Sequence, residues 1–226
     1  MKMKAILVGA SGATGSSLLF QLLENKSYSS VLALVRRELR IQHTKLKQLV
    51  IDFDRIDDHA EEIKGDAVFC CIGSTKSKTP DEKEYRKIDC QYPADLGRIA
   101  LKNGAESFHL VSFIRADASS SSLYIRIKGE AEDKIKTIPF PAIHIYRPAL
   151  FETSRKDKRF KESMGGILMQ AVNPLLIGRF QKYRSIKVEA IAKAMIRLSL
   201  EDRKGIFIHE SDEILKLSKE DNLPYR

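Results

Sequence analysis

A glycine-rich turn joins the first apolar segment of the chain to an amphipathic one. Gly9, Gly12 and Gly15 form a G-x-x-G-x-x-G pattern between the apolar run Ala5–Val8 and the helically spaced leucines of Ser16–Glu24. In such a unit the first glycine allows a tight turn, the second lets the backbone approach a pyrophosphate, and the third lets the helix pack on the strand. Free N–H groups at the start of that helix favour an anion. The pattern predicts a dinucleotide site made by Gly9, Ser11, Gly12, Ala13, Thr14 and Gly15. The alternative is a turn that binds no ligand.

Short apolar runs alternate with helical patterns along the rest of the chain. Strands are predicted at Ala5–Val8, Val31–Val35, Gln48–Ile51, Ala67–Ile72, Ser107–Ser112, Ala142–Tyr146 and Gly205–Ile208. Helices are predicted at Ser16–Glu24, Glu82–Lys102, Tyr124–Ile135 and Val188–Leu200. Pro93 lies inside the second helix, which is therefore either kinked there or divided in two.

Apolar strands alternating with helices indicate a parallel sheet that is covered on both faces. The 226 residues contain no internal repeat and no Pro/Gly/Ser-rich linker. We therefore expect an α/β fold, a single doubly wound Rossmann domain over residues 1–226. Within it, residues 151–187 and 209–226 are expected to form substrate-side loops and a tail.

The composition excludes several classes of protein. With 43% hydrophobic and 31% charged residues, the chain is neither disordered nor collagen-like. Cys70, Cys71 and Cys90 have neither a disulfide nor a zinc spacing, and the five histidines are scattered, so no metal site is expected. Reduced thiols, and an N-terminal apolar run that ends in a turn rather than a cleavage site, predict a cytoplasmic protein.

The longest apolar stretch elsewhere runs from Met164 to Ile177 and is interrupted by Asn173 and Pro174. It is shorter than the roughly 20 residues that a membrane-spanning helix needs, so no span is expected. A helix covering the substrate and a contact between copies in a homo-oligomer both fit this stretch. A peripheral membrane contact is a further alternative.

The net charge of +9 favours an anionic partner, which could be nucleic acid, a membrane surface or a phosphorylated ligand. Basic residues cluster at 155–161 and 179–187, with Phe160, Phe180 and Tyr183 among them. Aromatic side chains could stack on bases there. Charge alone gives only non-specific affinity, so solvated loops or a site for an anionic substrate explain these clusters more simply. No specific nucleic-acid partner is expected.

Two arginines follow the second predicted strand, at the place where NAD-binding proteins usually have an acid for the ribose 2′-hydroxyl. The strand ends in Leu34 and Val35, and Arg36 and Arg37 come next. A guanidinium group is planar and always charged, which suits a 2′-phosphate. The sequence therefore favours NADP(H) over NAD(H), unless both arginines are ordinary surface charges.

A Tyr-x-x-x-Lys pattern, Tyr124 to Lys128, opens the predicted helix after the fifth strand. At this spacing both side chains share a helix face, and a nearby ammonium group lowers the pKa of a phenol. Ser112, at the carboxyl end of the fifth strand, is predicted to bind a substrate carbonyl. A second match, Tyr183 to Lys187, lies in a basic loop with no strand-end serine before it and is interpreted as a coincidence.

Six stretches resemble the atypical branch of the short-chain dehydrogenase/reductase superfamily, and within it the Tat-interactive-protein oxidoreductase group of NAD(P)-binding proteins. They are GASGATGSSL, CCIGSTKSK, HLVSF, LYIRIKGEAE, YRPAL and KYRSIKVEAIAKAM, from Gly9 to Met195. The resemblance implies a Rossmann fold, NADP(H), and a catalytic set of Ser112, Tyr124 and Lys128. It also implies cofactor contacts at Asp52 and Phe53 (adenine), Cys71, Ile72 and Gly73 (ribose), and around Arg147 and Leu150 (nicotinamide).

One position departs from the family pattern. Many relatives carry an asparagine in the helix before the fifth strand, where it completes a proton relay, and this chain has Ile88 and Asp89 there. The relay is thereby in doubt, although the catalytic set is not.

These features predict an NADP(H)-dependent reductase of a small carbonyl compound, with Tyr124 as general acid. The alternative is a regulatory module that senses NADP(H) and has little or no turnover. Epimerase chemistry on the same scaffold is a third hypothesis. A G-x-S-x-G nucleophile turn is absent from the sequence, which argues against a hydrolase.

Overall fold

The computed structural model describes residues 2–74, 77–152, 176 and 178–220. Seven parallel strands form one sheet in the order β3-β2-β1-β4-β5-β6-β9. The strands are β1 (Met3–Val8), β2 (Tyr28–Val35), β3 (Leu46–Val50), β4 (Ala67–Cys70), β5 (Ser107–Val111), β6 (Ala142–Arg147) and β9 (Gly205–Glu210). Each overlaps one of the seven predicted strands. The predicted α/β fold with a doubly wound parallel sheet is confirmed.

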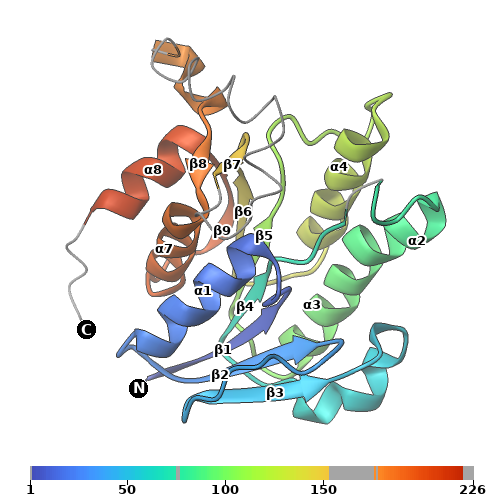
Figure 1. Ribbon diagram of the computed structural model, residues 1–226, viewed down its shortest axis with the longest axis vertical. Coiled ribbons are helices and arrows are strands. Elements are labelled where there is room, and N and C mark those ends of the chain that lie inside the picture. Colours follow the sequence, from blue (N-terminus) through green and yellow to red (C-terminus); the bar gives the residue numbers. More distant parts are fainter. Residues whose placement is uncertain (1, 75–76, 153–175, 177, 221–226) are drawn as a thin grey trace.

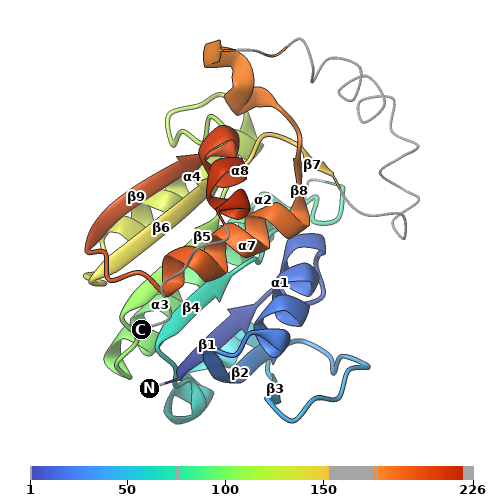
Figure 2. The same cartoon turned by 90° about the vertical axis from the view of Figure 1, so that its left-hand side faces the viewer.

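Helices cover both faces of the sheet (Figures 1 and 2). On one face lie α1 (Ala13–Glu24), α7 (Val188–Ser199) and α8 (Ser211–Lys219), which share a core with alternate strand residues such as Leu7 and Phe69. On the other face lie α3 (Tyr92–Lys102) and α4 (Leu123–Lys136), packed on the opposite residues such as Ile6 and Val68. Strands buried on both faces explain why the sequence shows continuous apolar runs.

The predicted helix Glu82–Lys102 is continuous but changes its winding in the middle. It consists of α2 (Glu82–Arg86), a π-helical turn η2 (Lys87–Gln91) and α3. At the end of this turn the Tyr92 N–H bonds to the Lys87 carbonyl oxygen, five residues back. Pro93 has no N–H, and its ring would clash with the carbonyl of Asp89 in a regular α-helix. The wider turn accommodates the proline without a break.

Five further elements, three helical segments and two short strands, have no counterpart among the predicted strands and helices. A 3₁₀ segment η1 (Phe53–Glu62) follows β3, a second 3₁₀ segment η4 (Gly178–Tyr183) precedes β8, and α8 extends beyond β9. The short strands β7 (Phe151–Glu152) and β8 (Ile186–Lys187) pair in parallel. The predicted helix or contact at Met164–Ile177 and the basic residues 155–161 lie outside the described residues, apart from Leu176. Among the described residues, no helix is long and apolar enough to cross a membrane.

Candidate active site

The glycine turn follows β1 directly, and steric contacts fix two of its three glycines. Gly9 has a φ of +84°, and a Cβ there would lie 2.5 Å from the Cys71 carbonyl group at the end of β4. A Cβ on Gly15 would lie 2.1 Å from the Gly9 oxygen. Both positions therefore exclude any larger residue, the first by conformation and contact, the second by contact alone.

Gly12 has a different environment. A Cβ there would meet only the Gly9 oxygen, at 3.3 Å, and its outer side is open. Gly12 is the N-cap of α1, and no acidic residue stands in the first turn of that helix. The positive end of the helix is thus free to receive an anion, and the backbone of the turn is accessible to it. Ser11 and Ala13 are exposed, whereas Thr14 is buried.

Arg36 and Arg37 follow the carboxyl end of β2 and are both exposed. Neither forms an ion pair with any residue that the structure describes. Their charges therefore remain available for an anionic ligand. Beyond the next strand, the Asp52 carboxylate caps η1 by accepting the Asp54 N–H at 3.0 Å. Phe53 is buried, with its ring 5.3 Å from that of Tyr92.

Gly73 lies beyond the carboxyl end of β4, after Cys71 and Ile72, and touches a buried ion pair. A Cβ on Gly73 would stand 3.1 Å from the Lys128 ammonium nitrogen and 3.4 Å from Oδ2 of Asp89. Lys128 Nζ and Asp89 Oδ2 are 2.8 Å apart, and these side chains are 9% and 0% exposed. The segment predicted to run along the ribose is therefore in contact with the predicted catalytic lysine.

Tyr124 and Lys128 lie one turn apart on α4, as the spacing predicts. Burial raises the pKa of Tyr124, Lys128 lowers it, Asp89 raises it, and the net pKa is above the usual value. Burial would lower the pKa of Lys128, but the ion pair with Asp89, together with the Tyr124 phenol, keeps it raised. Lys128 does lower the pKa of the phenol, but this effect is smaller than the rise that burial causes.

Ser112 lies at the end of β5 and is buried, but its hydroxyl points to another partner. Ser112 Oγ donates to Oε1 of Glu132 at 2.6 Å. Arg147 binds the same carboxylate in a bidentate manner, with Nε to Oε1 at 2.9 Å and Nη2 to Oε2 at 2.6 Å. Glu132 is 0% exposed. These three side chains join α4 to the ends of β5 and β6, and Lys136 Nζ on α4 lies 3.7 Å from the same carboxylate.

The turn after β5 brings an aromatic residue to the phenol. Phe113 and Tyr124 make an edge-on contact, with ring centroids 4.9 Å apart. In the same turn the Ala116 N–H bonds to the Phe113 oxygen, and Arg115 has a left-handed φ of 63°. Left-handed backbone is uncommon for an arginine and costs free energy. Phe113 was not among the predicted site residues, because its contact with Tyr124 depends on this turn.

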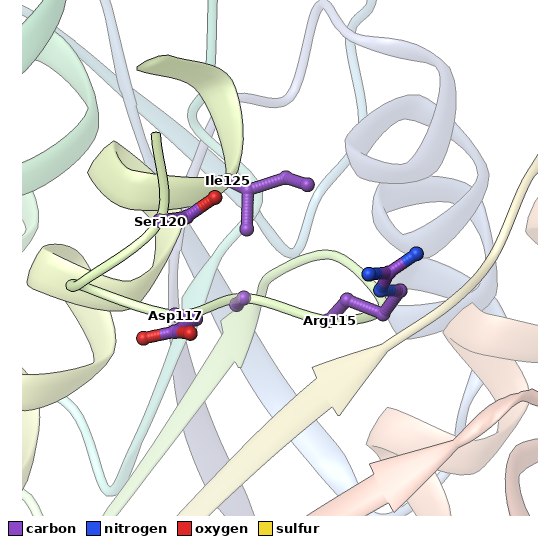
Figure 3. A pocket seen from close by; sticks show the side chains of 5 residues that line it. Arg115, Asp117, Ser120 and Ile125 are labelled. Atoms are coloured by element: carbon purple, nitrogen blue, oxygen red, sulfur yellow. The ribbon is translucent and has the colours of Figure 1, made fainter. Parts of the chain in front are cut away.

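A pocket of about 380 Å³ opens beside this turn and is lined by Arg115, Ala116, Asp117, Ser120 and Ile125. Figure 3 shows the Arg115 and Asp117 side chains directed to opposite sides of the chain. Backbone and hydroxyl bonds from Ser119 lower the pKa of Asp117. The pocket is lined by Ile125, the residue after Tyr124, and not by Tyr124 itself.

The second Tyr-x-x-x-Lys pattern does not form a helical pair. Tyr183 ends the 3₁₀ segment η4, whereas Lys187 belongs to β8. The two residues therefore lack the spacing on one helix that Tyr124 and Lys128 have. Nearby, the Leu150 oxygen accepts the Ile186 N–H at 2.8 Å. This bond holds the start of the predicted substrate-side segment against its end.

Three of the five histidines stack inside the sheet. The ring centroids of His109 and His144 are 4.9 Å apart, and those of His144 and His209 are 5.3 Å apart. His144 and His209 share a hydrogen bond of 3.1 Å, and His109 bonds the Tyr146 hydroxyl at 3.0 Å. Burial lowers the pKa of His144 to about 3 and that of His109 well below its usual value. Across the described residues, no group of His, Cys, Asp and Glu is suited to hold a metal ion.

Sequence reasoning did not include Glu132 or the pairing of Asp89 with Lys128. Glu132 carried a usable signal, since it shares the buried face of α4 with Ile127, Lys128, Ala131 and Ile135. A charged residue among apolar ones on such a face requires a partner. Asp89 could not be paired from sequence, because the π-helical turn changes which face its side chain occupies.

Comparisons with known proteins identify the family of the chain. A family model described as NAD(P)H-binding matches residues 9–161. The HTATIP2 protein of Rattus norvegicus is 29% identical over 99% of this chain and 93% of its own length. The mitochondrial protein FMP52 of Meyerozyma guilliermondii is 30% identical over 99% of this chain and 98% of its own length. The resemblance stated from the motifs is confirmed.

Solved structures agree on the fold. The Bordetella bronchiseptica enzyme WbmH, solved with NAD⁺, has a TM-score of 0.70 and 17% sequence identity. The match covers 96% of this chain and 79% of that one. A short chain dehydrogenase family protein from Francisella tularensis has a TM-score of 0.66 and 15% identity, covering 92% and 97% of the two chains. At these identities the likeness concerns the fold alone.

The expected cytoplasmic location is wrong on these comparisons. The FMP52 relatives of Meyerozyma guilliermondii, Eremothecium gossypii, Candida albicans and Saccharomyces cerevisiae are all named as mitochondrial proteins. Similarity thus points away from the cytoplasm. The cysteine usage on which the expectation was based indicates only reduced thiols, a condition that more than one compartment meets.

Proposed function

The chain belongs to the family of NAD(P)H-binding proteins, and on that premise we propose that it is an NADP(H)-dependent reductase of a small carbonyl compound. The proposal rests above all on one observation. Lys128, one helical turn from Tyr124, lies against Gly73 just beyond the end of β4, and β4 is the direct neighbour of β1, which leads into the glycine turn. A proton donor and a dinucleotide turn thereby share the carboxyl edge of the sheet, where ligands of such folds bind.

The residues of this edge fit a dinucleotide phosphate. The open backbone at Gly12 and the N-terminus of α1 would receive the pyrophosphate. Arg36 and Arg37, exposed and without ion pairs among the described residues, would receive a 2′-phosphate, which favours NADP(H) over NAD(H). Asp52 and Phe53 would border the adenine.

The remaining predicted contacts are nearer to the reacting end. Cys71, Ile72 and Gly73 would border the ribose, and the main chain around Leu150 would lie by the nicotinamide. The Arg147 side chain already binds Glu132, so its contribution there would come through the backbone.

NADPH, when bound, supplies a hydride to the carbonyl carbon. Tyr124 donates its proton to the carbonyl oxygen and thereby neutralises the charge that develops there. The Lys128 ammonium group opposes the rise in the phenol pKa that burial causes. Lys128 would also donate hydrogen bonds to the ribose hydroxyls. Phe113, on the edge of the Tyr124 ring, keeps the phenol in place.

We keep Ser112 in the proposed catalytic set, on the condition that its hydroxyl can be released from its present hydrogen bond. To donate to a substrate carbonyl, its hydroxyl must leave the Glu132 carboxylate, to which it now donates at 2.6 Å. If Ser112 keeps that bond during turnover, it acts by holding the end of β5 against α4. Ser112→Ala separates these roles, since loss of substrate orientation lowers kcat, whereas loss of anchoring lowers thermal stability.

The test is a paired titration of the purified protein with NADPH and NADH, followed by a carbonyl substrate screen. We expect binding of NADPH to be tighter than that of NADH and to be weakened by Arg36→Ala. Oxidation of NADPH with an aldehyde, ketone or quinone would then establish the reaction. Absence of binding by both nucleotides would overturn the proposal.

A regulatory NADP(H)-binding module is the second candidate, and two observations favour it. The Ser112 hydroxyl is occupied by Glu132, and the net pKa of Tyr124 is raised rather than lowered by its surroundings. Both features would slow proton transfer without weakening nucleotide binding. Tight NADPH binding with no turnover across the whole substrate panel would favour this module over the reductase.

A further inference from the structure

The π-helical turn η2 contains Asp89, the residue at which this chain departs from the family pattern. Asp89 is only 2% exposed, although the α2–η2–α3 run is a surface helix with charged residues along it. Burying a carboxylate is costly unless the charge is paired and hydrogen-bonded. A π-helical turn is itself uncommon and is often found at functional sites. The position of Asp89 therefore calls for an explanation in its contacts.

Both carboxylate oxygens of Asp89 have partners on other elements. Oδ1 accepts the Ser74 N–H at 2.7 Å, just beyond the end of β4. Oδ2 lies 2.8 Å from Lys128 Nζ on α4. One side chain thus connects a helix, the segment after β4, and the helix that carries Tyr124.

Gly73 separates this ion pair from the surface of the sheet edge. The Lys128 nitrogen would be 3.1 Å from a Cβ at Gly73, so any side chain there would displace the ammonium group or the loop. The ammonium group is therefore held close to the backbone of Gly73.

We propose that Asp89 is the positioning residue of this site, holding the Lys128 ammonium group against Gly73 so that it faces the place of a nucleotide ribose. The inference rests on the proposed function, because that function supplies the nucleotide that Lys128 would contact. An asparagine at position 89 could also accept the Ser74 bond, but only the carboxylate adds a counter-charge for the buried lysine.

The counter-charge is needed because the other groups around Lys128 are not anions at neutral pH. A buried lysine without an anion loses its proton readily. The titratable groups that face Lys128 from the packed elements are Asp89 on η2, Tyr124 on α4, Tyr85 on α2, Cys70 on β4 and Cys90 on η2. Burial raises the pKa values of both tyrosines and both cysteines, so Asp89 supplies the charge.

The test compares Asp89→Asn with Asp95→Asn as a matched control. Asp95 accepts hydrogen bonds from Gln91 and ion-pairs with Arg98 on its own helix, away from Lys128. Lysine labelled with ¹³C at Cε gives one NMR signal for each side chain, and the Lys128 signal is identified by its loss in Lys128→Arg. This experiment needs no nucleotide.

In the wild type and in Asp95→Asn we expect the Lys128 signal to show no titration below about pH 11. In Asp89→Asn the midpoint should lie at least one pH unit lower, a tenfold loss in proton affinity. Unchanged titration in Asp89→Asn would overturn the inference. A variant that does not fold is replaced by Asp89→Glu, which keeps the charge, and Lys128 should then still resist titration up to pH 11.

The second readout is the pH dependence of NADPH binding. In Asp89→Asn the NADPH affinity should fall about tenfold at pH 8. The decline of that affinity at alkaline pH, called here the alkaline limb, should also begin at a lower pH. In Asp95→Asn the affinity should stay within twofold of the wild type. An affinity and limb identical to wild type would contradict the positioning role. If the wild type binds no nucleotide, the proposed function fails, and the NMR titration still decides whether Asp89 holds the charge.

Discussion

Two buried carboxylates, Asp89 and Glu132, connect the helix α4 to other elements in different ways. Both are almost fully inaccessible, at 2% and 0% exposure. Asp89 reaches α4 from η2 and pairs with Lys128, which lies against Gly73 at the sheet edge. Glu132 belongs to α4 itself and binds Ser112 and Arg147, at the ends of β5 and β6.

Lys128 and Glu132 are four residues apart on α4, a spacing at which opposite charges often pair. Lys128 instead pairs with Asp89 on η2, and Glu132 pairs with Arg147 on β6 as well as with Lys136 of its own helix. The Asp89–Lys128 pair borders the proposed nucleotide site, whereas Glu132 binds the Ser112 and Arg147 side chains away from Gly73. The comparison teaches that burial and pairing alone do not mark a functional charge. What distinguishes the two is whether the partner of the carboxylate also faces a place where a ligand binds.

The largest expected effect is a loss of turnover on substituting Tyr124, which lies one turn from Lys128 on α4. Tyr124→Phe removes the proposed general acid, so turnover should fall by about 10²–10⁴-fold. NADPH affinity should change by less than about twofold, because the phenyl ring still packs on Phe113. Steady-state kinetics and fluorescence titration measure the two quantities. Turnover that survives the substitution would remove Tyr124 from the mechanism.

On the other side of the comparison, Glu132→Ala should act on folding. It leaves the Arg147 guanidinium and the Ser112 hydroxyl without their partner, at a cost of about 3–5 kcal/mol in the free energy of unfolding. Urea denaturation measures this, with Asp133→Asn as control, since the Asp133 side chain is 63% exposed. Equal stabilities of the two variants would show that the cluster does not hold α4 to the sheet.

His144, in the stack of histidines, is a third buried group, and burial lowers its pKa so that it carries no charge at neutral pH. The folded-state pKa of His144 is about 3, below its unfolded value near 6.5. Between these two values the unfolded chain binds more protons, so stability is full above pH 6.5 and falls as the pH decreases. His144 alone should remove about 2 kcal/mol by pH 5.

Urea denaturation between pH 5 and pH 8 tests this. The fall in stability below pH 6.5 should be smaller in His144→Phe, which cannot be protonated. An identical pH dependence in the variant would assign the acid sensitivity to other groups, of which His109 is the first to examine, since its pKa is also lowered by burial.

The smallest expected effect lies at the far end of the nucleotide site. Arg36→Ala should weaken NADPH binding about tenfold, as expected for the loss of one exposed charge–phosphate contact. NADH binding should stay the same, because NADH has no 2′-phosphate. Arg40→Ala, another exposed arginine of the same loop, serves as control. Equal weakening of both nucleotides by Arg36→Ala would point to non-specific electrostatics.

Much of the fold followed from the sequence, because its signals are local. Seven apolar runs with helical segments between them predicted the parallel sheet, and the glycine spacing predicted the turn after β1. The contacts of Gly9 and Gly15 now give the steric reason for two of those glycines. The sequence also predicted that Tyr124 and Lys128 share a helix face. It likewise predicted that the second match, Tyr183 to Lys187, is a coincidence in a loop.

Other features depended on where distant segments meet. Pro93 signalled a disturbed helix, but not that a π-helical turn would precede it and enclose Asp89. The position of Ser112 at a strand end was predicted, but its hydroxyl partner, 20 residues away on α4, was not. The direction of the shift in the Tyr124 pKa also depends on burial and on Asp89, which no local pattern contains.

By itself, then, the sequence determined the architecture, the dinucleotide turn and the identity of the polar residues at the sheet edge. Periodicity and glycine chemistry are properties of neighbouring residues, and a single chain displays them directly. Only the tertiary structure decided how the charges on α4 are paired, Lys128 with Asp89 and Glu132 with Arg147. Charge pairing depends on distance in space, and the distances between charges on different elements are set only when the chain is folded.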